Sequence, residues 1–320
     1  MTDQDFEHLP SYAELSARED APKGTNWGLF GADDQLGTVN FLTPEKVREA
    51  AALVRHGKVF ALNLPLHLPS PALLTRKNPQ HHIIRFEGGG GHDDYLDQLY
   101  LHASSHWDGL THIGSPRHGF YNGVRPDQVT GEEGTRNGIE HWAQRGIVGR
   151  GVLLDVARYM DSQGKPIDPW SSYAIKVDVL EATVRAQGVE IRPADILLLR
   201  TGWLKFYLAA DQATREHVAE DLRSPGLQGS MEMAAWLWDH RIAALGTDCP
   251  AVEPWPWDPS VGVLHARVLC YLGMPIGEMF DLEALAEDCA RDGTYECMFT
   301  SAPLNLLGGV GSPPNALAIK

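Results

Sequence analysis

The segment LHASSHWDGLTH, residues 101–112, gathers the side chains that could carry out chemistry. It contains His102, His106, Asp108 and His112 within eleven positions. Neutral imidazole nitrogens and a carboxylate oxygen are donors that bind Zn²⁺ or Mn²⁺ in proteins. The pattern therefore indicates a metal site, whereas the plainer interpretation is a loop of solvated or hydrogen-bonded polar side chains.

The spacing restricts how these residues could meet at one ion. In a straight strand they share one face, but His102 and His106 would lie about 13 Å apart at roughly 3.3 Å per residue. In a helix His102 and His106 would be neighbours, but Asp108 would point elsewhere. If one ion is bound, the chain must bend near Ser104 and Ser105, and His106 and Asp108 can then come from an extended piece.

A single segment rarely completes a catalytic site, so we expect partners from later in the chain. His265 and Glu278 occur in LHARVLCYLGMPIGEMFDLEAL (264–285). Asp248 and Glu253 occur directly after an apolar run, in a position where functional loops often follow a strand. Considered without the rest of the chain, Glu278 is more simply interpreted as a helix cap or a surface carboxylate.

Apolar periodicity predicts the elements that position these residues. Amphipathic patterns with Pro or Gly boundaries predict helices over 44–56, 177–188, 230–241 and 281–293. Short apolar runs between turn signals predict strands over 58–66, 151–156, 195–202 and 242–248. Residues 301–319 are expected to form a strand, a glycine turn and a second strand. Strands and helices mix throughout, which indicates an α/β or α+β fold in one domain.

Composition limits the classes of partner and location. The net charge is −15, from 27 basic and 42 acidic residues, and no basic cluster is present, which argues against nucleic-acid or anionic-membrane partners. No apolar run approaches the roughly 20 residues that span a bilayer. The acidic N-terminal sequence lacks the pattern of a secretory signal, so we expect a cytoplasmic protein.

Two further features have simple interpretations. The four cysteines form no CxxC pair, which predicts buried or partly buried free thiols. The GGGG run at 88–91 predicts a flexible loop, because it lacks the Lys-Ser/Thr ending of a phosphate-binding loop.

The histidine-rich segment resembles the first motif of the cyclase family, which comprises kynurenine formamidase-like and isatin hydrolase-like metal-dependent hydrolases. All its histidine and aspartate spacings match the family pattern, although Ser104-Ser105 replaces a Gly-Thr pair and Leu110 replaces a Pro. These departures resemble a longer subgroup with a Trp-Asp-Gly-Leu run followed by Tyr-Asn-Gly, here residues 121–123. Further family-like stretches occur at 26–47, 149–156, 197–203, 246–253 and 272–286.

The resemblance implies an architecture. Family members are compact α/β domains with a mixed sheet or barrel-like core surrounded by helices. We therefore expect a single catalytic domain over residues 26–320, preceded by an N-terminal arm over residues 1–25. The resemblance also implies assembly as a homodimer or homotetramer.

The resemblance further implies roles for particular residues. The implied metal ligands are His102, His106, Asp108, His265 and Glu278. In members with two ions Asp108 bridges them, and His265 and Glu278 complete the second ion's shell. His112 would be the catalytic proton shuttle, and Glu278 would ligate the ion or assist proton transfer. One or two ions of Zn²⁺ or Mn²⁺ are expected, with no organic cofactor.

The implied activity is hydrolysis of an amide, ester or lactone bond in a small cyclic or aromatic compound by a metal-activated water. A metal-dependent cyclase or dehydratase is the alternative, and a non-catalytic binding protein on this fold is a further one. Several aromatic residues could wall a pocket for a flat ring or could equally pack in the core: Trp107, Phe120, Tyr121, Trp255 and Trp257. Because Trp107 alternates with the expected ligands, we expect it to point into the core.

Overall fold

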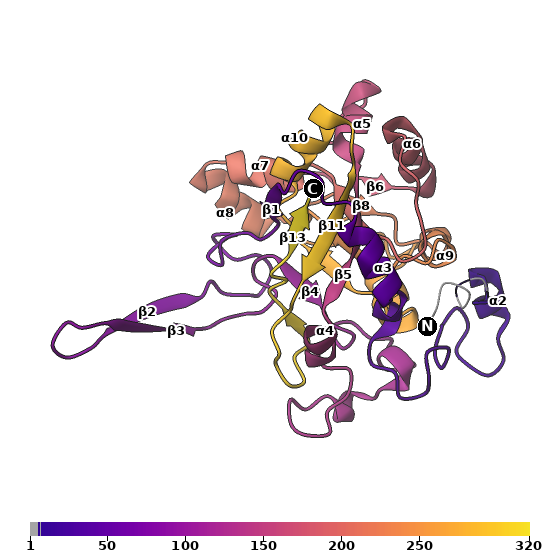
Figure 1. Ribbon diagram of the computed structural model, residues 1–320, viewed down its shortest axis with the longest axis horizontal. Helices are drawn as coiled ribbons and strands as arrows, with labels where there is room; N and C mark the ends of the chain where they lie inside the picture. The colour runs from indigo at the N-terminus through magenta and orange to yellow at the C-terminus, as the bar shows by residue number, and fades with distance from the viewer. Residues whose placement is uncertain (1–5, 7) are drawn as a thin grey trace.

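One curled, mixed sheet organises the chain in the computed structural model, which describes residue 6 and residues 8–320 (Figure 1). The expected N-terminal arm therefore includes residues 1–5 and 7, which lie outside the described residues. In spatial order, the nine strands that the described residues contribute to this sheet are β1 (Val59–Ala61), β13 (Leu317–Ile319), β11 (Glu296–Ser301), β5 (Ile147–Asp155), β7 (Ile196–Arg200), β9 (Ala244–Thr247), β10 (Ile276–Glu278), β4 (His106–Asp108) and β12 (Gly311–Ser312).

The centre of the sheet is parallel and its margins are antiparallel. Strands β5, β7, β9 and β10 run in the same direction, while β11, β13 and β1 on one side and β4 and β12 on the other pair antiparallel. Every residue of β7 and β9 is buried, as expected for apolar strands covered on both faces. The prediction of an α/β fold with a mixed sheet is confirmed.

Helices surround the sheet (Figure 1). The helices are α2 (Tyr12–Ala17), α3 (Pro44–Ala51), α4 (Glu140–Arg145), α5 (Val156–Ser162), α6 (Val177–Gln187), α7 (Trp203–Ala209), α8 (Gln212–Glu220), α9 (Met231–Asp239) and α10 (Glu283–Asp292). Short 3₁₀ segments occur at η1 (Gly37–Phe41), η2 (Tyr121–Gly123) and η3 (Pro126–Gln128), and η4 (Ala266–Tyr271) is a π-helix.

Local sequence signals account for the helix ends. Thr43 and Ser230 cap α3 and α9, because each hydroxyl accepts a backbone N–H from the first turn. Gly188 and Gly293 end α6 and α10 in the left-handed conformation that glycine adopts without a steric penalty. The helices predicted over 177–188, 230–241 and 281–293 are therefore confirmed to within a few residues.

Two boundaries differ from the prediction. The helix expected over 44–56 ends at Ala51, because the amides of His56 and Lys58 donate to the carbonyl of Lys320 and draw the chain towards β13. The strand expected over 58–66 forms only as β1, and beyond it the amide of Leu64 donates to the Ser105 hydroxyl instead of to a strand.

The C-terminal prediction is correct for the second strand, β13, and misplaced for the first. The first strand, β11, ends at Ser301 rather than beginning there, and Pro303, which has no N–H to donate, follows two residues later. Strand β12 then pairs with β4, while β13 pairs with both β11 and β1. The chain therefore returns to the sheet twice, at its two opposite sides.

A two-stranded ribbon projects from the body of the molecule (Figure 1). It consists of β2 (Gln80–Arg85) and β3 (His92–Asp97), and the GGGG run at 88–91 lies in the turn between them.

The N-terminal segment packs on α9, where the Trp238 indole donates to the carbonyl of Pro10. All four cysteines are free and buried, as predicted. Within the described residues, the helices are too short or too polar to cross a bilayer.

Candidate metal centre

Strand β4 places two of the predicted ligands on one face of the sheet. His106 and Asp108 are two residues apart and point to the same side, while Trp107 points to the other. In the register, His106 lies opposite Glu278 of β10, so the Glu278 carboxylate joins the same face. The Trp107 ring packs on Phe280 in the core and its indole donates to the Ser301 hydroxyl, which confirms its predicted orientation.

A bend before β4 brings His102 back to this face. Residues 103–105 turn sharply, as the spacing required, and the centroids of the His102 and His106 rings lie 5.0 Å apart. The Ser105 hydroxyl donates to the carbonyl of Met279 and so joins the bend to the residue after Glu278. The Arg76 guanidinium donates to the His102 carbonyl at 2.6 Å. Neither Ser105 nor Arg76 was predicted to support the site.

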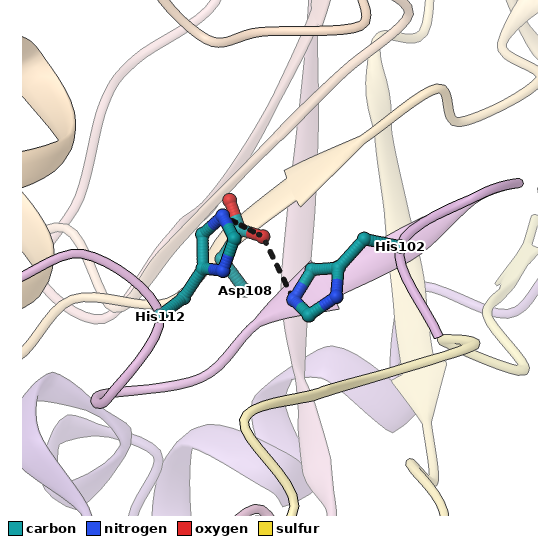
Figure 2. A group of neighbouring side chains, drawn as sticks. All are labelled: His102, Asp108 and His112. Atoms are coloured by element: carbon teal, nitrogen blue, oxygen red, sulfur yellow. Dashed lines mark ion pairs between the residues drawn. The ribbon is translucent and has the colours of Figure 1, made fainter. Parts of the chain in front are cut away.

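Three imidazoles converge on a single oxygen. The Nε2 atoms of His102, His106 and His112 lie 3.5, 3.3 and 3.6 Å from Asp108 Oδ1. Figure 2 shows the rings of His102 and His112 both directed at this carboxylate oxygen. Asp108 and His106 are fully buried, whereas the side chain of His112 is 24% exposed. The open side of the cluster is therefore at His112.

The residues predicted from the second half of the chain reach the same point. His265 Nε2 lies 3.2 Å from Asp108 Oδ2 and 3.1 Å from Glu278 Oε1. Glu278 Oε2 lies 3.3 Å from His106 Nε2, and Glu278 Oε1 accepts the backbone N–H of Val252. All six predicted site residues thus form one cluster at the junction of β4, β10 and the start of η4.

The charges in this cluster shift the pKa values strongly. Burial opposes protonation of His106, but the carboxylates of Asp108 and Glu278 outweigh it and raise the pKa of His106 to about 9. Burial also opposes protonation of His265, yet Glu253, Asp108 and Glu278 raise its pKa well above the ordinary value. These two imidazoles therefore hold positive charge against the carboxylates when no cation is bound.

The other groups shift in the opposite direction. Burial, together with the nearby His106, lowers the pKa of His102 to about 3. Burial lowers the pKa of His112 as well, so its neutral form is favoured. Although burial acts against ionisation, the histidines hold the pKa of Asp108 well below its usual range and that of Glu278 below its own.

The residues fit a divalent cation. Within the part of the chain that the structure describes, His102 Nε2, His106 Nε2 and Asp108 Oδ1 are buried without a hydrogen-bond partner. Two ligands at about 2.0–2.1 Å from a tetrahedral ion lie roughly 3.4 Å apart, close to the separations found here. Two sets of ligand atoms lie close enough together to hold an ion: one from His102, Asp108 and His112, the other from His106, Asp108 and Glu278. Asp108 is common to both.

Other residues singled out in the sequence lie outside this cluster or support it. The Asp248 carboxylate accepts the amides of Thr201 and Gly202, away from the histidines of the cluster. Glu253 bonds to His265 rather than facing the cluster itself. Trp255 and Trp257 contact each other edge to face at 5.0 Å, and Tyr121 is buried with its hydroxyl donating to Asp34.

Close approach by a glycine also shapes the site. Gly311 of β12 pairs with Asp108, and a Cβ atom built on Gly311 would overlap the imidazole of His102. The position of the His102 ring therefore depends on a glycine at residue 311, although nothing in the local sequence pattern identifies this requirement. Met279, next to Glu278, has a φ of 54°, an uncommon conformation for a non-glycine residue.

Comparisons with known proteins identify the family and the fold. The sequence model of a family described as "Putative cyclase" matches residues 43–254. A crystal structure described as a novel cyclase is 32% identical, with a TM-score of 0.82, and the match covers 92% of this chain and 99% of that chain. No curated protein matches the chain.

Two more distant structures share the fold. Isatin hydrolase A from Labrenzia aggregata, bound to benzyl benzoate, is 16% identical with a TM-score of 0.59, covering 84% of this chain and 94% of its own. Isatin hydrolase A from Ralstonia solanacearum is 18% identical with a TM-score of 0.55, covering 82% and 92%. At these identities the likeness is one of fold.

Proposed function

The chain belongs to the cyclase family, and from this premise we propose that it is a metal-dependent hydrolase of amide, ester or lactone bonds in small cyclic or aromatic compounds. The observation that carries the proposal is the convergence of three imidazole Nε2 atoms, within 3.6 Å, on Asp108 Oδ1. Such a set of nitrogen and oxygen donors, partly open on one side, is typical of catalytic metal sites.

In this proposal His102, His106 and Asp108 would hold a divalent cation, Zn²⁺ or Mn²⁺. Asp108, His265 and Glu278 would hold a second ion where two are bound. A bound cation of this kind supplies Lewis acidity, which polarises a carbonyl group and makes water acidic enough to ionise near neutral pH.

His112 is assigned the movement of the proton. Its Nε2 atom faces Asp108, and its ring is the most exposed of the four imidazoles around that carboxylate. Burial favours the neutral ring, so Nε2 can accept a proton from the attacking water and deliver it to the leaving nitrogen or oxygen. Asp108 keeps the protonated ring in place during this transfer.

Glu278 is assigned a supporting part in the same step. The Val252 N–H fixes Glu278 Oε1, while Oε2 remains directed at His106. In this proposal the Glu278 carboxylate would complete the cation's shell or assist the proton transfer.

Two structures that share the fold carry the name isatin hydrolase, so a cyclic amide is a reasonable first substrate class. The description of the family as a cyclase favours a second candidate, a metal-dependent cyclase or dehydratase. The two reactions differ in product mass, because hydrolysis adds one water to the substrate and dehydration removes one.

The test is a substrate screen of protein loaded with Zn²⁺ or Mn²⁺, using N-formyl aromatics, cyclic imides, isatin-like lactams and lactones. We expect turnover of at least one class, with a product heavier by one water and loss of turnover after chelation. Failure of the protein to retain either cation after metal-supplemented purification would overturn the proposal.

A further inference from the structure

Glu253 makes the most direct contact with the cluster among the residues that have no role in the proposed function. It follows β9 in the chain and is only 2% exposed. Its Oε2 atom accepts both the backbone N–H of His265, at 3.2 Å, and His265 Nδ1, at 2.7 Å. An ionised carboxylate can only accept hydrogen bonds, so Nδ1 must carry the proton in this contact.

That contact fixes how the His265 ring is presented. With Nδ1 engaged by Glu253, Nε2 is the nitrogen directed at Asp108 and Glu278, at 3.2 and 3.1 Å. Metal-binding histidines commonly donate their other ring N–H to a carboxylate in this way, which orients the ring and strengthens it as a ligand.

The backbone on either side of Glu253 is itself held firmly. Val252 donates its N–H to Glu278 Oε1, and its carbonyl accepts the N–H of Leu227 in β8 (Gly226–Leu227). A Cβ atom on Gly226 would overlap the backbone of Glu253, so β8 packs directly on this loop. Two adjacent residues, Val252 and Glu253, thus fix both Glu278 and His265.

We propose that Glu253 is a positioning residue, which holds the His265 imidazole with Nε2 towards Asp108 and Glu278 and thereby sets the affinity of this side of the site for a divalent cation. The inference rests on the proposed function, because it concerns the same cation. Glu253 touches neither the cation nor the substrate in this arrangement and acts only through His265.

The test compares Glu253→Ala with Glu253→Gln by titrating Mn²⁺ into chelator-treated protein in a calorimeter. The Ala variant removes the acceptor, and we expect the affinity for Mn²⁺ to fall about 10- to 100-fold. The Gln variant keeps a carbonyl oxygen of similar reach, which can still accept from Nδ1, and should restore most of the affinity.

Asp288→Ala is the matched control. Asp288 is a similarly buried carboxylate, 3% exposed, but it lies on α10 and bonds to Lys58 and Arg291. Its removal should lower the free energy of unfolding while leaving the Mn²⁺ affinity within about 3-fold. A general loss of stability would affect both variants, whereas loss of His265 positioning affects only Glu253→Ala.

A second measurement requires no variant. In the Zn²⁺-loaded chain, ¹⁵N NMR should find His265 protonated at Nδ1, and protonation at Nε2 would overturn the inference. So would an unchanged Mn²⁺ affinity in Glu253→Ala, or an equal loss in Glu253→Gln. If the unchanged chain binds neither cation, the proposed function fails and takes this inference with it.

Discussion

His106 Nε2 and Asp108 Oδ1 lie 3.3 Å apart on one face of β4, and in the described structure neither atom has a hydrogen-bond partner. Leaving such a buried atom unsatisfied costs about 1–3 kcal/mol. His102 Nε2 is in the same condition, so three buried atoms without a hydrogen-bond partner surround one point. Carboxylate oxygens of Asp108 and Glu278 lie 3.3 Å from His106 Nε2 and compensate it in part, and a cation bound at this point would satisfy all three atoms.

Replacing His106 with Ala should remove the cation and the activity together. His106 is fully buried and its Nε2 faces both Asp108 and Glu278, so no other side chain can take its place. We expect the Zn²⁺ or Mn²⁺ content after gel filtration to fall at least about 10-fold, measured by elemental analysis with turnover on the same sample. His141→Ala, a histidine paired with Glu140 outside the cluster, should retain both. Full cation content in His106→Ala would contradict its role as a ligand.

His112→Ala should separate cation binding from catalysis. The His112 ring lies on the exposed side of Asp108, and its assigned task is to move a proton. We expect kcat to fall about 10²- to 10⁴-fold, as is usual when a general base is removed, while the cation content stays near that of the unchanged chain. Because His112 also lies near enough to act as a ligand, loss of the cation in this variant would reassign it from proton carrier to ligand.

The sequence predicts the residues of the metal site better than it predicts the residues that position them. Four residues in one short segment, with donors that metals prefer, were recognisable from type and spacing, and the required bend near Ser104 and Ser105 followed from strand geometry. The roles of Glu278 and His265 depended on resemblance to a family, because a single carboxylate or imidazole carries no local signal. Glu253, Ser105 and Gly311 act through contacts across the fold that no periodicity encodes.

For the fold too, elements set by nearby residues were predicted, and elements set by distant parts of the chain were not. Helices α6, α9 and α10 were predicted because their caps and glycine stops lie within a few residues of the pattern that they end. The short strands β4, β10 and β12 have too few residues to show a period, and they form because neighbouring strands pair with them. The end of α3 was misplaced because it depends on a bond to Lys320, at the other end of the chain.

Gly311→Ala should weaken cation binding although it replaces no ligand. The added Cβ would overlap the His102 imidazole, so either the ring or strand β12 must move. Because Gly311 pairs with Asp108, both ligands are disturbed, and we expect the Mn²⁺ affinity to fall at least about 10-fold in calorimetric titration. Gly90→Ala is the control, since a Cβ there meets open space at the turn of the β2–β3 ribbon. Equal affinities for Mn²⁺ in the two variants would show that the His102 ring can move without weakening cation binding.

Asp248 should make the stability of the chain depend on pH in the opposite sense to an ordinary surface carboxylate. It is fully buried, and burial raises the pKa of Asp248 to about 6 despite the amides of Thr201 and Gly202 that bond to it. In the unfolded chain its pKa is about 3.9. The folded state therefore binds the proton more tightly, so this contribution to stability is complete below about pH 3.9 and is lost as the pH rises through about 6.

The measurement is urea denaturation of the unchanged chain and of Asp248→Asn, both with a chelator, from about pH 4 to pH 7. Asn cannot titrate, and its amide group faces the same two N–H donors, so the variant should be less stable by an offset that does not vary with pH. Relative to it, the unchanged chain should lose about 2–3 kcal/mol of unfolding free energy as the pH rises across this range. Parallel curves for the two proteins would show that Asp248 is already ionised at pH 4, which would mean that its hydrogen bonds outweigh its burial.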